Sequence, residues 1–238
     1  MPHISELINK YAFSSKDRFL NYVQIDTQSD PHSSTSPTTE KQKNLGKILV
    51  QELQSLGIQN AHLDEFGYVY AHIASNVSHK VPGLCFCAHM DTSPDCSGAG
   101  VKPIVHPYYH GQDLVLPDDP SVIIRLSEHP DLAEQIGNDI ITASGTTLLG
   151  ADNKAGVAEI MDVAAFYYSN PDVPHGPITL LFTPDEEVGR GTDHVNMEKI
   201  NAKYGYTLDG EKRGHLENET FSADGFVVKI QGISQHPG

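Results

Sequence analysis

The chain has 238 residues, a formal net charge of −15 at pH 7 and a hydrophobic fraction of 38%. This length is enough for one large α/β domain, or for one domain and part of another. The acidic charge argues against nucleic-acid binding, because phosphate contacts require clustered Lys and Arg. No apolar run approaches the ~20 residues that a membrane helix needs, and the first residues lack a signal-peptide pattern. The three cysteines form no disulfide framework, so we expect a cytoplasmic protein with neither nucleic acid nor a membrane as partner.

Predicted helices and strands alternate along the chain. Apolar residues at helical spacing predict helices over residues 16–25, 45–56 and 155–168. Short apolar runs predict strands over residues 68–73, 84–87, 140–142, 178–182 and 204–208. The Pro-rich stretch 93–137 is interpreted as a long insertion rather than a separate domain. This alternation predicts an α/β fold with a mostly parallel, mixed sheet and helices on both faces.

One more strand is predicted over residues 226–230, shortly before His236-Pro237-Gly238. A strand needs a paired neighbour, and an apolar face needs cover. Nothing after this run in the given sequence supplies either. We therefore expect apolar surface to be exposed on this strand and on the edge of the sheet.

Four short segments place an imidazole or a carboxylate at or just after a predicted strand end: residues 88–92, 149–154, 185–189 and 208–210. In open α/β sheets, reactive groups lie just past the carboxyl ends of the strands. The four segments are therefore candidates for one shared site.

The first segment contains His89 and Asp91. Residues two apart in an extended chain point to the same side. Asp91 could therefore hydrogen-bond the free ring nitrogen of His89 and fix its tautomer as a metal ligand. The alternative, favoured for an isolated pair, is a surface histidine beside a turn aspartate.

The other segments supply carboxylates, each with a structural alternative. Asp152 could bridge two cations or cap the following helix. Glu186 and Glu187 are costly to bury together unless a cation offsets their charge, and the alternative is a solvated acidic turn. With a metal present, one glutamate could ligate it while the other takes a proton from metal-bound water. Asp209 before a glycine is also typical of an ordinary turn.

The combination favours a site for two divalent ions, because four such segments in this order are hard to obtain by chance. Cys85 and Cys87 alternate within a predicted strand and have no second Cys pair at zinc-finger spacing. We interpret them as small core residues rather than as zinc ligands.

These motifs resemble the aminotripeptidase branch of the co-catalytic zinc aminopeptidase and carboxypeptidase family. The resemblance runs from about residue 19 to the last residue and is strongest over residues 89–98, 147–156 and 182–189. It implies two Zn²⁺ ions, with His89 and Asp209 holding one ion, Glu187 holding the other, and Asp152 bridging both. It further implies that Asp91 orients His89 and that Glu186 is the general base. The implied reaction is hydrolysis of the N-terminal peptide bond of a tripeptide.

The family pattern also includes a smaller α+β lid domain, followed by a return to the catalytic domain that carries the last His ligand of the second zinc. By this resemblance, residues 1–219 form the catalytic domain without that return, and residues 220–238 form the first strand of the lid domain. His236 would help to stabilise the reaction oxyanion. We therefore expect weak binding of the second zinc, and the resemblance allows a homodimer in a full-length form.

Two alternatives stay open at this point. One is an amino-acid deacylase or carboxypeptidase of the same family, which would use the same metal ligands. The other, from a different class, is a non-catalytic fragment that binds metal. The physiological metal is open too, since carboxylate-rich sites also take Mn²⁺ or Co²⁺.

Overall fold

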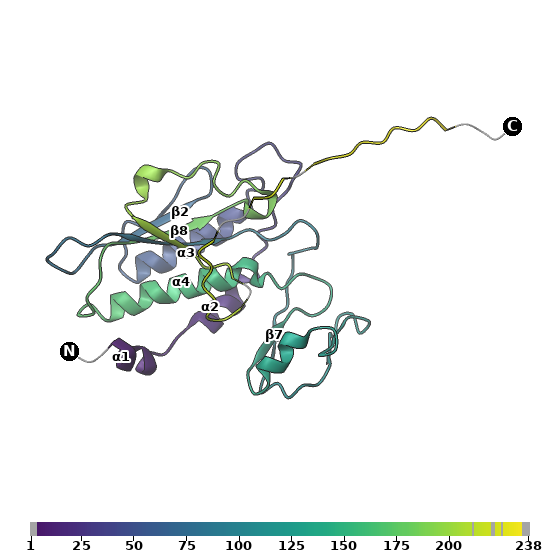
Figure 1. Cartoon of the computed structure of the whole chain (residues 1–238), viewed down its shortest axis with the longest axis horizontal. Helices are drawn as coiled ribbons and strands as arrows, with labels where there is room; N and C mark the ends of the chain where they lie inside the picture. The colour runs from purple at the N-terminus through teal and green to yellow at the C-terminus, as the bar shows by residue number, and fades with distance from the viewer. Residues whose placement is uncertain (1–3, 211, 220–221, 225, 235–238) are drawn as a thin grey trace.

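The computed structural model describes residues 4–210, 212–219, 222–224 and 226–234 (Figure 1). Its centre is a five-stranded sheet with the strand order β1-β2-β8-β3-β9. The strands are β1 (His62–Leu63), β2 (Val69–Ile73), β8 (Ile178–Thr183), β3 (Leu84–His89) and β9 (Tyr204–Thr207). The neighbours β8, β3 and β9 are parallel, whereas β1 and β2 run antiparallel to their neighbours. The α/β class and the mixed sheet are therefore confirmed.

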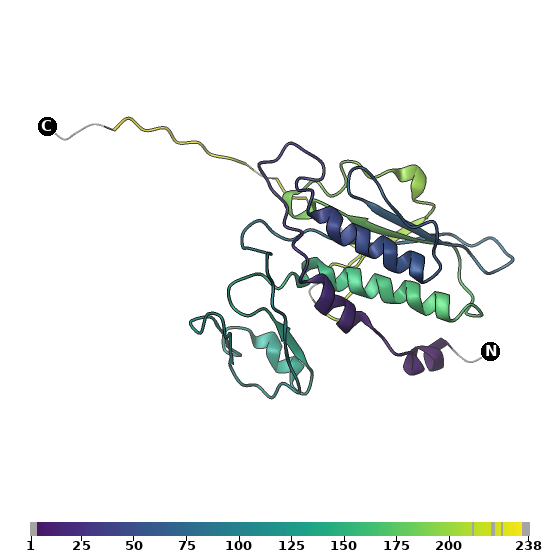
Figure 2. The same cartoon turned by 180° about the vertical axis from the view of Figure 1, so that it is seen from behind.

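One face of the sheet carries the main core. Helices α2 (Ser15–Tyr22), α3 (Gln42–Ser55) and α4 (Ala151–Ser169) pack there, with α3 and α4 side by side in both views (Figures 1 and 2). Alternate strand residues point into this core because successive side chains of a strand face opposite sides. The fully buried members include Leu45, Leu49, Leu53, Val69, Ala71, Ala88, Met90, Ile160, Leu180 and Phe182.

The opposite face carries a smaller cluster around Tyr68, Tyr70, Cys85 and Leu181. Its cover comes from the segment between β8 and β9, which includes the short 3-10 helix η3 (Met197–Lys199). Within the described residues, helical cover thus lies on both faces, as α-helices on the first face and as the short η3 on the second. Segment 184–203 has no repeat of apolar residues at helical spacing that would form an α-helix. Cys85 and Cys87 pack in this cluster, as expected for core residues.

The Pro-rich insertion and the residues after it form a small lobe beside the main sheet (Figure 1). In this lobe β4 (Ile104–His106) pairs with β7 (Ile140–Thr142), and β5 (Leu114–Val115) pairs with β6 (Ile123–Ile124). The 3-10 helix η1 (Pro130–Gln135) completes the lobe. The strand over 140–142 was correctly predicted, but it belongs to this lobe and not to the main sheet.

The two ends of the described chain differ from the sequence prediction. A short helix, α1 (Ile4–Lys10), precedes the first predicted helix and buries none of its residues. Residues 226–230 form no strand and extend away from the molecule (Figure 1), with Phe226 88% and Ile230 91% exposed. The predicted strand is wrong here because none of the described residues pairs with it, whereas the expected apolar exposure is confirmed.

The domain boundary at residues 219 and 220 stays a prediction, and His236 lies outside the described residues. Among the helices that the structure describes, none has the length and hydropathy needed to cross a bilayer.

Candidate metal centre

Three parallel strands bring most of the motifs together at the carboxyl end of the sheet, which is called its carboxyl edge from here on. His89 is the last residue of β3, the pair Glu186 and Glu187 follows β8, and Asp209 follows β9. The pairing of His89 with Thr183 and of Cys87 with Thr207 places the carboxyl ends of these strands next to one another. The prediction that these residues share an edge is therefore confirmed.

Asp152 reaches the same place from a helix rather than from a sheet strand. Gly150 adopts a left-handed conformation before it, and Asp152 itself has non-helical dihedral angles (φ −81°, ψ 105°). Its carboxylate consequently turns toward β3, where Oδ1 lies 2.9 Å from Nε2 of His89. The capping alternative for Asp152 is wrong, because Asn153 caps the helix by accepting a hydrogen bond from the N–H of Gly156 (3.2 Å).

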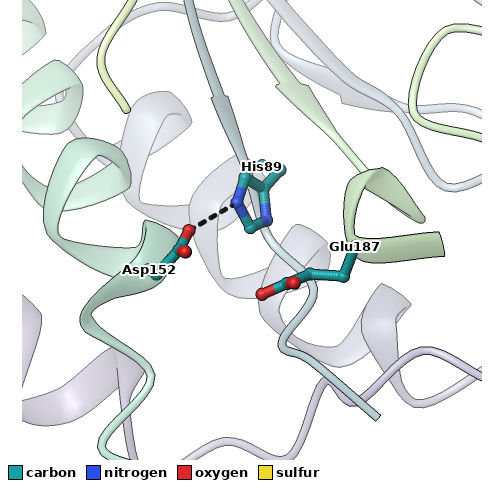
Figure 3. Close-up of side chains that lie close together, drawn as sticks. All are labelled: His89, Asp152 and Glu187. Carbon is teal, nitrogen blue, oxygen red and sulfur yellow. Dashed lines mark hydrogen bonds and ion pairs between the residues drawn. The ribbon is translucent and has the colours of Figure 1, made fainter. Parts of the chain in front are cut away.

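His89 is the centre of the site and is only 2% exposed. Its Nδ1 lies 3.1 Å from the backbone oxygen and 3.3 Å from Oδ1 of Asp91. Its Nε2 faces Asp152, with Glu186 Oε2 at 3.7 Å and Asp209 Oδ2 at 3.8 Å. In Figure 3 the imidazole lies between Asp152 and Glu187. The alternative of a surface histidine is therefore wrong.

Ligand atoms of His89, Asp152 and Glu187 lie within 4.8 Å of one another. Imidazole nitrogen and carboxylate oxygen are the donors that Zn²⁺ and similar divalent ions take. Asp209 approaches the same imidazole nitrogen, as given above. His89, Asp152 and Glu187 therefore form a donor set of suitable chemistry, with Asp209 beside it.

Among the described residues, His89 is the only basic side chain paired with the carboxylates at this edge. Burial, followed by the charge of Asp152, raises the pKa of Glu187 to about 7. Burial also raises the pKa of Asp209. Burial alone would lower the pKa of His89, but the hydrogen bond and charge of Asp91, with the charges of Asp209 and Glu186, raise this pKa to about 9.

No Lys or Arg of the described residues forms an ion pair with these carboxylates. A divalent cation would offset the excess negative charge, so the electrostatics fit a metal centre.

Asp91 has a second contact that the sequence did not reveal. Its carboxylate is fully buried and accepts hydrogen bonds from the N–H groups of Glu186 (3.0 Å) and Glu187 (3.1 Å). Asp91 therefore holds both the histidine and the turn of the two glutamates. A separation of 95 residues gives no sequence signal for this contact.

The side chains that face the centre differ in their access to solvent. The side chain of Asp152 is 74% exposed, that of Glu186 54% and that of Asp209 30%. The site is therefore buried on the side of His89 and Asp91 and open on the side of the carboxylates.

Fold and site together define an α/β protein with a carboxylate-rich candidate metal centre at the carboxyl edge of its sheet. No protein-family model matches the chain. The chain is similar to Peptidase T of Halothermothrix orenii, with 47% identity over 222 residues, which are 93% of this chain and 54% of that protein. It thus spans about half the length of the curated relatives that it matches.

Two solved structures are similar as well. Aminopeptidase PepT from Bacillus cereus matches with a TM-score of 0.57 and 25% identity, over 88% of this chain and 44% of that one. A tripeptidase from Staphylococcus aureus matches with a TM-score of 0.57 and 26% identity, over 83% of this chain and 43% of that one. The resemblance predicted from the motifs is therefore confirmed: the chain resembles Peptidase T.

Proposed function

We propose that the chain is the catalytic part of a metallopeptidase that hydrolyses the N-terminal peptide bond of tripeptides. The observation that carries this proposal is the convergence of His89, Asp152 and Glu187 within 4.8 Å at the carboxyl edge of the sheet. The names of the similar proteins, Peptidase T, aminopeptidase and tripeptidase, support the substrate class.

We further propose that the centre takes two Zn²⁺ ions. His89 and Asp209 would hold one, Glu187 the other, and Asp152 would bridge them. Bound zinc lowers the pKa of a water ligand and polarises a peptide carbonyl. The contact of Asp91 with Nδ1 would hold the proton on that nitrogen, so that Nε2 could give up its own proton and offer its lone pair to a bound metal.

Glu186 is the proposed general base. Its Oε2 lies 3.7 Å from Nε2 of His89, so its carboxylate faces the space between the proposed ligands. It would take a proton from the attacking water and give it to the leaving amine. Its half-exposed side chain can reach both the water and the substrate.

Hydrolysis of trialanine by the 238-residue chain with added zinc tests this function. We compare the wild type with Glu186→Gln, which keeps the shape of the side chain but cannot accept a proton. Glu128→Gln, on the exposed surface of the small lobe, is the matched control. Activity that is lost in Glu186→Gln alone supports the proposal; equal activity in all three proteins contradicts the assigned base.

A substrate panel separates the alternatives. Tripeptides, dipeptides and N-acyl amino acids distinguish an aminotripeptidase from a deacylase or carboxypeptidase, because only an aminopeptidase requires a free α-amine. The non-catalytic alternative has its own supporting observation: for the second ion, the proposed ligands within the described residues are Asp152 and Glu187 alone. Zinc binding without any turnover would favour that alternative.

A further inference from the structure

The turn that carries Glu186 and Glu187 begins with a third acidic residue, Asp185. This residue is fully buried and has a left-handed backbone (φ 59°). Asp tolerates that conformation better than most other non-glycine residues. Its carboxylate bonds to Thr38 and Gln42, which belong to a distant part of the chain.

Uncharged groups donate hydrogen bonds to both carboxylate oxygens of Asp185. Its Oδ1 accepts hydrogen bonds from the hydroxyl of Thr38 and from Nε2 of Gln42 (2.7 Å), and its Oδ2 accepts one from the N–H of Thr38 (2.8 Å). In return, the N–H of Asp185 donates to Oε1 of Gln42 (3.1 Å). A buried carboxylate is tolerated only where such donors surround it, so its place is closely defined.

A second connection joins the same turn to the same part of the chain. The guanidinium of Arg190 donates to the backbone oxygens of Ser33 (3.0 Å) and Thr35 (2.9 Å). The N–H of Arg190 donates to the backbone oxygen of Asp185 (2.9 Å). Both ends of the turn are therefore attached to residues 33–42, while Asp91 holds its middle from the other side.

We infer that Asp185 is a positioning residue, whose buried carboxylate sets where Glu186 and Glu187 stand relative to His89. The inference rests on the proposed function for its consequence, which is the placing of a metal ligand and a base. Residues that fix a ligand in this way typically contribute about 10- to 100-fold to metal affinity. Loss of the Asp185 contacts should therefore weaken zinc binding and loosen the turn.

The test uses Asp185→Asn, because its amide would present a donor to the N–H of Thr38. Asp162→Asn is the matched control. Asp162 is also a buried carboxylate filled by backbone N–H and hydroxyl groups, in this case of Ser14 and Ser15. It lies about 15 Å further along α4 from Asp152.

Two quantities are measured for each variant: the zinc dissociation constant, and hydrogen exchange of a peptide spanning residues 178–190. We expect Asp185→Asn to weaken zinc binding about 10- to 100-fold and to speed exchange mainly in that peptide, whereas Asp162→Asn does neither. Thr38→Val, which removes one donor at nearly constant shape, should shift both quantities less, in the same direction. If Asp185→Asn does not fold, the Thr38→Val variant tests whether the Asp185 contacts position the turn.

Unchanged zinc binding and unchanged exchange in folded Asp185→Asn would overturn the inference. A uniform rise of exchange throughout the core in both Asp variants would overturn it too, since that result is expected from a purely structural residue. If the wild-type chain binds no zinc, the proposed function fails, while the exchange comparison still decides the role of Asp185.

Discussion

Replacement of Gly156 by alanine should disturb the metal centre through the backbone. A Cβ atom at this position would lie 2.0 Å from the backbone oxygen of Leu208 and 2.4 Å from Oδ1 of Asn153. Leu208 directly precedes Asp209, and Asn153 directly follows Asp152. One added methyl group therefore pushes against the chain beside two proposed metal ligands.

The size of the disturbance follows from that contact. A Cβ contact below 3.0 Å is essentially never observed, so Leu208 or helix α4 must move by about 1 Å. Alanine favours a helix over glycine by up to ~1 kcal/mol, whereas overpacking costs ~1–3 kcal/mol. We expect the cost of the clash to exceed the gain in helix propensity, since the atom in contact belongs to the backbone and cannot easily move. The free energy of unfolding should therefore fall by about 1–2 kcal/mol. A displaced Asp209 should also weaken zinc binding by about tenfold or more.

Urea denaturation and zinc titration measure the two effects. Gly46→Ala is the matched control, because Gly46 is also a buried helical glycine. Its nearest neighbour is the end of a flexible side chain, Cδ1 of Leu63 at 2.8 Å, which can move aside. We expect a smaller loss of stability there and unchanged zinc affinity. A Gly156→Ala chain as stable as the wild type, with the same zinc affinity, would refute the reasoning.

Four further outcomes are expected. Zinc titration of the wild-type chain should give one tighter and one weaker site, and two equally tight sites would contradict the ligand count. Asp91→Ala should lower the free energy of unfolding by about 2 kcal/mol in urea, because the part-buried N–H groups of Glu186 and Glu187 lose the fully buried carboxylate that accepts their hydrogen bonds. A thiol reagent at pH 8 should modify the exposed Cys96 first. Burial raises the pKa of Cys85 to about 11 and that of Cys87 to about 12, so these two residues hold little of the reactive thiolate. Equal rates for all three thiols would show that Cys85 and Cys87 are accessible. A variant that ends at residue 224 should self-associate less in sedimentation velocity, since it lacks the exposed apolar residues of 226–234; unchanged association would exclude that segment as its cause.

The sequence predicted the part of the site that depends on strand direction. Parallel strands bring their carboxyl ends to one edge, so His89, Glu186, Glu187 and Asp209 could be placed together before any contact was known. Local periodicity is sufficient for this because each residue follows a strand that its own apolar run defines. Asp152 also lies at the site, as predicted, but for a different reason: its preceding strand belongs to the small lobe, and its position depends on a non-helical turn at the start of α4.

Contacts between distant parts of the chain could not be predicted in this way. The bonds from Glu186 to Asp91 and from Thr38 to Asp185 span 95 and 147 residues. The wrong prediction of a strand over 226–230 has the same origin. An alternating apolar pattern indicates that a segment can form a strand, but not whether a neighbouring strand is present to pair with it.

Burial and hydrogen bonding divide the acidic residues of this edge into two groups that the sequence cannot distinguish. Asp91 and Asp185 are fully buried, and backbone N–H groups together with polar side chains fill their oxygens. Asp152, Glu186 and Asp209 instead turn partly exposed carboxylates toward Nε2 of His89, with no Lys or Arg among the described residues to pair with them. Carboxylates whose oxygens already accept hydrogen bonds can only support the surrounding structure. Carboxylates with free oxygens and uncompensated charge can bind a cation. An acidic residue at this edge thus either supports the site or is free to bind a cation, and the hydrogen-bond donors around its carboxylate determine which of the two it does.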